Sequence, residues 1–122
     1  MRRFVGRAVL IALVIGAGTL PAMPAMADCG INTGHFCAYK GSQFNNRILH
    51  SSAPAGTDNV DVADDVVSSG KNGTNNHWCG MTNVILLPPD LVFDFAPHTA
   101  VEYVGDGAND RIDWFKVRSS SC

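Results

Sequence analysis

Two neighbouring acids followed by two neighbouring serines are the part of this chain best suited to bind a ligand. The stretch "ADDVVSSGKNG", residues 63–73, places Asp64 and Asp65 before Ser68 and Ser69. Carboxylate and hydroxyl oxygens are the ligands that a hard cation such as Ca²⁺ prefers. The same short polar side chains also form turns, because they hydrogen-bond to nearby backbone. The stretch is therefore either a polar turn or part of a calcium site.

A second stretch repeats part of this pattern 45 residues later. "ANDRIDWFKV", residues 108–117, aligns with "ADDVVSSGKN", residues 63–72. Asn109, Asp110 and Asp113 supply further oxygen ligands in this second copy. Two similar units of a loop and a strand predict a duplicated half-domain rather than a solenoid.

The remaining reactive side chains form no enzyme motif. The four histidines, His35, His50, His77 and His98, are scattered, and the sequence holds no serine-centred elbow, HExxH helix or pair of glutamates. His77 lies close to Cys79, but we expect Cys79 to be oxidised, which removes the reactive thiolate. We therefore expect no catalytic activity.

The first 27 residues have the pattern of a secretory signal peptide. Three arginines precede an apolar run at residues 8–18, and residues 25–27 form the small-residue cleavage motif Ala-Met-Ala. We therefore expect a secreted, extracellular protein in which residues 1–27 are the signal peptide. The mature chain, residues 28–122, has the length of one domain.

The expected mature chain of 95 residues is acidic. It keeps six basic and eleven acidic residues, which gives a net charge of −5. Such a charge is unfavourable for contact with nucleic acid or with anionic membrane surfaces. We expect no nucleic-acid partner, no membrane partner once the signal peptide is removed, and a monomer.

Four cysteines, all in the mature part, indicate two disulfides. A small secreted chain has little hydrophobic core, and disulfides commonly supply the missing stability. The sequence allows three pairings of Cys29, Cys37, Cys79 and Cys122. We favour Cys29–Cys37, which closes a short loop, and Cys79–Cys122, which ties down the C-terminus.

The pattern of apolar residues predicts an all-β protein. No part of the mature chain keeps a 3.6-residue apolar period, and short apolar or alternating runs separated by turn residues are typical of a sandwich or barrel. We expect Pro88 and Pro89 to end a strand, because proline lacks the N–H donor. The strand candidates are residues 35–40, 47–50, 65–69, 77–82, 83–87, 91–95, 100–104 and 111–117.

Two motifs of the first half resemble those of βγ-crystallins. "YKGSQFNN", residues 39–46, resembles the aromatic hairpin of their Greek keys, with Tyr39 and Phe44 at the aromatic places and Asn46 in place of the usual glycine. Asparagine is the next-best residue for a left-handed backbone. "DDVVSS", residues 64–69, matches the calcium-loop pattern of that family. The resemblance implies a single-domain, βγ-crystallin-like Greek-key sandwich.

The same resemblance implies a calcium site built from two paired loops. Its ligands would be Asp64, Asp65 and Ser68 on one side, with Asp110 and Asp113 as candidate partners. Ser69 would fasten the hairpin instead. We expect weak Ca²⁺ binding, in the range typical of extracellular modules, and no other cofactor.

The second half departs from the crystallin pattern. Tyr103 and Gly105 could form an aromatic corner, but His98 stands where the first aromatic residue belongs. Asp113 and Trp114 replace the serine pair. A second complete calcium loop is therefore not expected.

A longer stretch implies a function. "FCAYKGSQFNNR", residues 36–47, resembles the start of secreted actinobacterial metalloproteinase inhibitors, which have a βγ-crystallin-like fold. The resemblance implies inhibition of an extracellular protease, with a reactive bond after a cysteine. Cys79 is the best match, so the expected inhibitory loop is Trp78, Cys79, Gly80 and Met81. Gly80 departs from the bulky apolar residue that thermolysin-like enzymes prefer after the cut.

Other readings of the sequence stay open. The stretch "VILLPPD", residues 84–90, is a stiff apolar strip and a rival inhibitory segment. The chain could instead be a calcium-binding structural or interaction module of the βγ-crystallin type. A killer-toxin-like antimicrobial protein is the third alternative.

Overall fold

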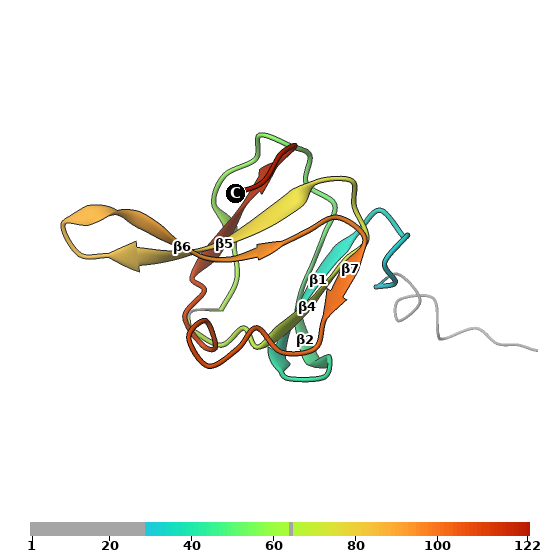
Figure 1. Cartoon of the computed structure of the whole chain (residues 1–122), viewed down its shortest axis with the longest axis horizontal. Helices are drawn as coiled ribbons and strands as arrows, with labels where there is room; N and C mark the ends of the chain where they lie inside the picture. The colour runs from blue at the N-terminus through green and yellow to red at the C-terminus, as the bar shows by residue number, and fades with distance from the viewer. Residues whose placement is uncertain (1–28, 64) are drawn as a thin grey trace, which may run out of the picture.

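The computed structural model of the chain describes residues 29–63 and 65–122, and these residues form eight β-strands (Figure 1). Among them no helix is long and apolar enough to cross a membrane. The strands are β1 (Phe36–Gly41), β2 (Asn45–Ser51), β3 (Val60–Asp61), β4 (Ser69–Asn72), β5 (His77–Val84), β6 (Leu87–Phe95), β7 (Thr99–Val101) and β8 (Trp114–Arg118).

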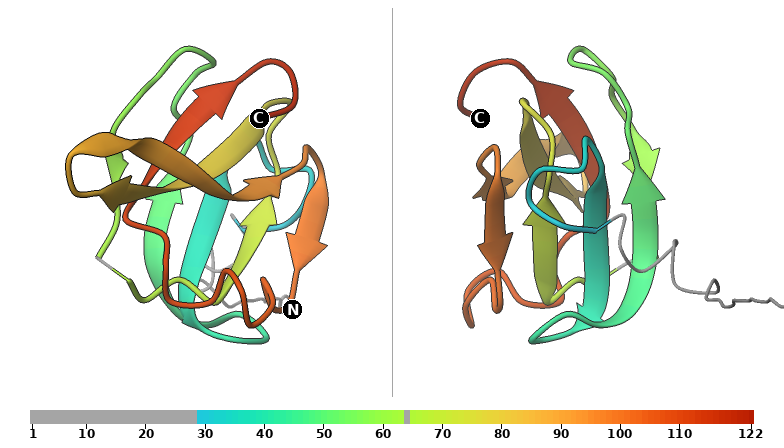
Figure 2. Two further views of the ribbon diagram at one scale, coloured as in Figure 1. Left: turned by 60° about the vertical axis from the view of Figure 1, so that its left-hand side comes forward. Right: turned by 90° about the vertical axis from the view of Figure 1, so that its right-hand side faces the viewer.

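The strands form two antiparallel sheets, as Figure 2 shows from two sides. One sheet has the order β2-β1-β4-β7 and the other the order β3-β8-β5-β6. Strands β1 to β4 make up the first half of the chain and β5 to β8 the second half. The third strand of each half, β3 or β7, pairs within the sheet formed by the other half. This exchange joins the two halves into one unit.

The repeat of 45 residues seen in the sequence is confirmed by the strand positions. Strand β4 begins at Ser69 and β8 begins at Trp114, so the fourth strands of the two halves are offset by 45 residues. Both strands lie next to the first strand of their own half. The chain is thus a duplicated half-domain with exchanged third strands.

Aromatic side chains fill the space between the sheets. The rings of Phe36 and Trp78 stack with centroids 4.4 Å apart, and Phe95 and Phe115 pack edge-on against Phe36. All four side chains are fully buried. Offset and edge-on aromatic pairs are worth about 1 kcal/mol beyond the area they bury, so this cluster joins the two halves firmly.

Both favoured disulfides are confirmed. Cys29 pairs with Cys37 and Cys79 pairs with Cys122, each with Cα atoms 5.8 Å apart. Such pairing is consistent with an extracellular location. Each half of the molecule therefore has one disulfide with a cysteine in its first strand, Cys37 in β1 or Cys79 in β5.

The strand predictions need several corrections. The sequence does not predict strand β3, and the strands predicted at residues 100–104 and 111–117 are observed as β7 and β8. Residues 65–68 form a loop, and the strand predicted there begins only at Ser69. The pair β5 and β6 is joined by a two-residue turn in the middle of the predicted strand 83–87. Pro88 and Pro89 do not end a strand, because they lie in β6, which is the outer strand of its sheet and has no neighbour on one side.

Candidate functional site

The two loops that the sequence pairs do lie against each other. The backbone N–H of Asp65 donates to the carbonyl of Ile112 at 3.3 Å, and the N–H of Asp110 donates to the carbonyl of Val67 at 3.2 Å. Each bond maps onto the other by the 45-residue offset. Asp65 and Asp110 both have a left-handed backbone, with φ of 57° and 59°. The loops before β4 and β8 are therefore related by pseudo-twofold symmetry.

One group of oxygen atoms from both loops converges. The hydroxyl of the buried Ser68 lies 2.5 Å from Oδ1 of Asn109 and 3.5 Å from Oδ1 of Asp110. Across residues 29–63 and 65–122, no three His, Cys, Asp or Glu side chains gather into a metal cluster. A cation at this position would therefore depend on hydroxyl, amide and backbone oxygens beside one carboxylate.

The predicted calcium ligands do not all share this position. Asp64 lies outside the described residues, and Asp65 is exposed. Asp113 serves another purpose: its Oδ2 accepts bonds from the backbone N–H of Asn83 at 2.8 Å and the hydroxyl of Thr82 at 3.2 Å. The structure brings Ser68 to Asp110, whereas Asp113 bonds to Thr82 and Asn83 of β5.

Ser69 holds the first hairpin closed, as the resemblance implies. Its buried hydroxyl donates to the carbonyl of Gly41 at 2.7 Å and accepts the N–H of Phe44 at 3.1 Å. The rings of Tyr39 and Phe44 meet edge-on with centroids 5.6 Å apart. Burial raises the pKa of the Tyr39 phenol, and the nearby charge of Arg47 partly offsets that rise. The β1–β2 hairpin is thus packed onto its own sheet.

The residues of the predicted inhibitory loop are buried. Trp78, Cys79 and Gly80 are buried and Met81 is 5% exposed, because all four lie in β5 between β6 and β8. A side chain at Gly80 would meet the side chain of Ile112, so this glycine is required for packing. A protease cleft has no access to these residues without opening the sheet.

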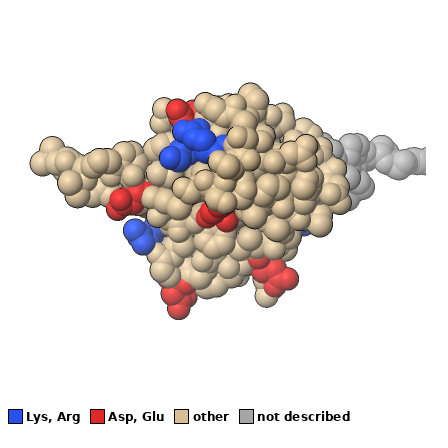
Figure 3. Space-filling model, turned by 45° about the horizontal axis from the view of Figure 1, so that its top comes forward, with Lys and Arg blue, Asp and Glu red and all other residues tan. Residues whose placement is uncertain are grey.

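The rival segment is the exposed one. Ile85, Leu86 and Leu87 are 88%, 98% and 65% exposed at the turn between β5 and β6. Figure 1 shows this hairpin extending beyond the two sheets, and in Figure 3 its outer part has no coloured charged residue. The apolar pattern predicts a buried strand at residues 83–87, since periodicity alone cannot separate a buried strand from an exposed one.

The proposed second aromatic corner is also corrected. Tyr103 lies in the loop between β7 and β8, where its hydroxyl donates to Asp106 at 2.6 Å. That bond raises the pKa of the Tyr103 phenol. The counterpart of the first hairpin is the β5–β6 hairpin, which has no aromatic pair at its turn.

Comparison with known proteins supports the fold. No protein-family model and no curated protein matches the chain. A βγ-crystallin domain from Clostridium beijerinckii has a TM-score of 0.52 at 15% identity, over 70% of this chain and 99% of that chain. A single-site and a double mutant of that domain give TM-scores of 0.51 at 16% and 17% identity, over 70% of this chain and 99% and 98% of theirs. The chain therefore has a βγ-crystallin-like fold.

Proposed function

We propose that this chain is a secreted inhibitor of an extracellular metalloprotease, and that the β5–β6 hairpin is its contact segment. The observation that carries this proposal is the exposure of Ile85, Leu86 and Leu87 at one tip. Most apolar surface in a small monomer is scattered, and a contiguous exposed patch commonly marks an interaction site. Thermolysin-like enzymes take bulky apolar residues of this kind.

The hairpin is stiff enough to bind at low cost. Its strands pair from Trp78 and Phe95 out to Val84 and Leu87, and the Asp113 carboxylate accepts the N–H of Asn83 next to Val84. A segment that is already ordered loses little conformational entropy on binding. The tip can therefore enter a cleft without a change in the fold.

The prolines of the hairpin limit how it can bind. Strand addition requires free backbone N–H groups along an outer strand, and Pro88 and Pro89 lack these donors in β6. Side-chain insertion is left as the mode of contact. A partner with a deep apolar pocket fits three exposed aliphatic side chains best.

Leu86 is the residue that we expect to anchor the contact. It has φ of 64° at the second position of the turn, where Gly or Asn is usual. A left-handed leucine costs about 1 kcal/mol, and at 98% exposure its side chain gains almost no contact in return. A contact with a partner accounts for a leucine at this position.

The test is the residual activity of a thermolysin-like metalloprotease against increasing amounts of the secreted chain. We expect stoichiometric loss of activity, and Leu86→Asn should weaken inhibition about 30-fold, as for an interface residue worth about 2 kcal/mol. Ile31→Asn is the matched control, because Ile31 is an exposed aliphatic residue outside the hairpin. Full activity at large excess, with a serine protease as well, would refute inhibition.

Calcium binding is the second proposed function. The observation that favours it is the approach of Ser68, Asn109 and Asp110 across the two symmetric loops. These residues offer a hydroxyl, an amide oxygen and a carboxylate, and nearby carbonyls could complete a calcium shell. A single carboxylate in this set favours weak binding.

Thermal unfolding with and without calcium tests this second function. For a Kd of about 0.3 mM, calcium at about 10 mM should stabilise the fold by about 2 kcal/mol. Asp110→Asn should remove that gain, since it keeps the shape and the left-handed preference of the residue but loses its charge. Asp113→Asn is the control that should keep the gain. An unchanged melting temperature in calcium would exclude this function.

A further inference from the structure

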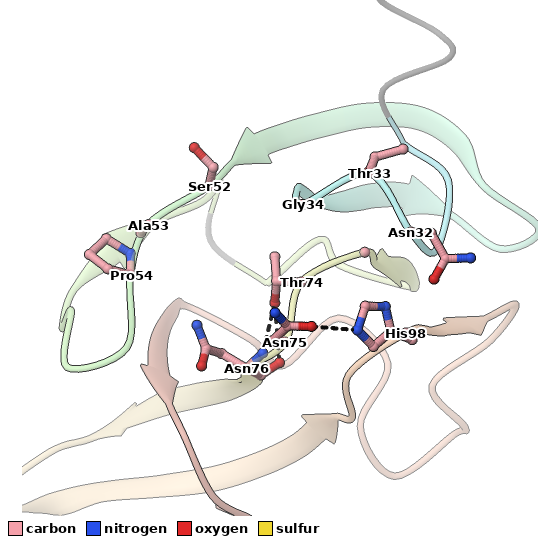
Figure 4. Close-up of a pocket in the computed structure, with 11 residues that line it drawn as sticks. Asn32, Thr33, Gly34, Ser52, Ala53, Pro54, Thr74, Asn75, Asn76 and His98 are labelled. Carbon is pink, nitrogen blue, oxygen red and sulfur yellow. Dashed lines mark hydrogen bonds between the residues drawn. The ribbon is translucent and has the colours of Figure 1, made fainter.

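A polar hollow lies on the side of the molecule formed by four separate segments. It has a volume of about 470 Å³ and is lined from the N-terminal loop, the β2–β3 loop, the β4–β5 turn and the β6–β7 turn. Figure 4 shows Asn32 and Thr33 on one side of it, and Ser52 and Pro54 on another. This volume lies in the range of small-molecule sites.

Two of the four segments that line the hollow, the N-terminal loop and the β4–β5 turn, are fixed to each other. Gly34 donates to the carbonyl of Gly73 and Gly73 donates to the carbonyl of His35, both at 2.8 Å. A side chain at Gly73 would collide with the backbone of Gly30, so the two segments pack as closely as a glycine permits. The N-terminal loop and the β4–β5 turn therefore form one rigid wall.

The buried side chain of Asn72 holds the β4–β5 turn in place beneath the hollow. The side-chain amide of Asn72 donates to the carbonyls of Asn76, Phe95 and Ala96 at 2.7 to 3.1 Å, and its oxygen accepts from Thr74. Asn72 is fully buried. This network ties the β4–β5 turn to the end of β6, and a site with fixed walls binds a ligand without first being ordered.

His98 closes the hollow from the β6–β7 turn. Its ring nitrogen atoms lie 2.8 Å from the carbonyl oxygen of Ile31 and 2.7 Å from Oδ1 of Asn75, the second of which Figure 4 marks with a dashed line. The ring therefore holds the β6–β7 turn against both segments of that wall. It offers a flat face beside the polar groups, as the ring of Pro54 does on the other side.

The absence of Asp, Glu, Lys and Arg from the lining favours an uncharged, polar ligand. The eleven lining residues include no Asp, Glu, Lys or Arg, although the chain is rich in aspartate. A charged ligand would find no charged partner there, and burying an unpaired charge is costly. An apolar ligand would cover amides and hydroxyls without replacing their bonds to water.

Several polar groups of the lining are free to bind. Within residues 29–63 and 65–122, the side chains of Asn32, Ser52 and Asn76 make no hydrogen bond to another residue. An amide offers a donor and an acceptor side by side, and a hydroxyl offers both on one atom. These groups match neighbouring hydroxyls of a ligand, each of which also donates and accepts.

We propose that this hollow is a binding site for a neutral saccharide, of about the size of one sugar ring. Asn32, Asn76 and Ser52 hydrogen-bond its hydroxyl groups, and the rings of His98 and Pro54 contact its apolar face. The site lies beside the end of the β5–β6 hairpin that is opposite its tip, and it does not depend on protease inhibition.

An NMR titration of the ¹⁵N-labelled chain tests the proposal. The probes are glucose, galactose, mannose and N-acetylglucosamine, with glucuronate and inorganic phosphate as charged probes, each to about 100 mM. We expect saturable shifts for at least one neutral sugar, confined to the amides of the N-terminal loop, Ser52 and Ala53, residues 73–76 and His98. Asn76→Ala should weaken that binding at least about fivefold, the loss expected for one hydrogen bond.

Matched controls separate the site from the fold. Asn76→Ala keeps the backbone carbonyl that Asn72 uses, so its thermal unfolding should be unchanged, and Asn32→Ala serves as a second site variant. Asn45→Ala removes an exposed asparagine at the start of β2 and should leave sugar binding intact. The proposal fails if no neutral sugar shifts these amides, if both site variants bind as the parent does, or if the charged probes bind more tightly.

Discussion

The β1–β2 and β5–β6 hairpins occupy equivalent places in the two halves of the molecule, but one is packed and the other is exposed. The β1–β2 hairpin lies packed on its sheet, with Phe44 against Tyr39 and its turn bonded to Ser69. The β5–β6 hairpin extends into solvent, with Leu86 at its tip almost fully exposed. One hairpin therefore stabilises the fold, and the other is available for a partner.

The two hairpins are held by different side chains. Ser68 and Ser69 of the first half correspond to Asp113 and Trp114 of the second half, at the offset of 45 residues. Ser69 bonds to Gly41 and Phe44 at the turn of its hairpin, whereas Asp113 and the indole N–H of Trp114 bond to Asn83 in β5, before the turn. The exposed residues Ile85 and Leu86 lie beyond these bonds.

The largest expected effect concerns the disulfides, one in each half. The loop-entropy relation assigns about 4 kcal/mol to Cys79–Cys122, which spans 43 residues, and about 2.5 kcal/mol to Cys29–Cys37, which spans 8. Replacing each pair by alanine and measuring unfolding in urea checks the order. If both variants lost the same free energy of unfolding, the Cys79–Cys122 bond would contribute no more to stability than the Cys29–Cys37 bond.

The next effect concerns the closed hairpin. Ser69→Ala removes a fully buried hydroxyl and leaves the Gly41 carbonyl and the Phe44 N–H without it, so the free energy of unfolding should fall by about 2 kcal/mol. Urea unfolding measures the loss. Ser42→Ala, at an exposed position of the same turn, is the control and should change stability by less than about 0.5 kcal/mol.

A smaller effect is expected where Asp113 holds the exposed β5–β6 hairpin. Asp113→Ala removes the acceptor for the Asn83 N–H and the Thr82 hydroxyl, and this partly exposed site should lose about 1 kcal/mol. Hydrogen exchange should also speed up at Asn83 and remain unchanged at Phe44. Faster exchange at both amides would mean that the two hairpins are not held independently.

The smallest effect has the opposite sign. Leu86→Asn should raise the free energy of unfolding by about 0.5 kcal/mol, because asparagine accepts the left-handed backbone more readily and the leucine side chain buries little. Thermal unfolding measures the gain, with Asn59→Leu as the reverse change at another exposed left-handed residue. A destabilised Leu86→Asn variant would show that the tip packs within the molecule.

Much of the fold could be predicted because local chemistry decides it. Short apolar runs and turn residues predict an all-β chain, the cysteines predict two disulfides, and the left-handed backbone expected at Asn46 has φ of 59°. The errors concern exposure. Met81 and Leu86 are both apolar residues near a predicted strand end, and one is buried while the other projects into solvent.

The sequence by itself determined the strand-rich character, the pairing of the two loops and the candidate ligands Ser68 and Asp110. Only the tertiary structure decided that Trp78 to Met81 are covered, that the β5–β6 tip is exposed, and that four distant segments form a polar hollow. The physical reason is that hydrogen-bonding type and turn preference belong to single residues. Burial depends on which strands become neighbours, and here each half completes the sheet of the other.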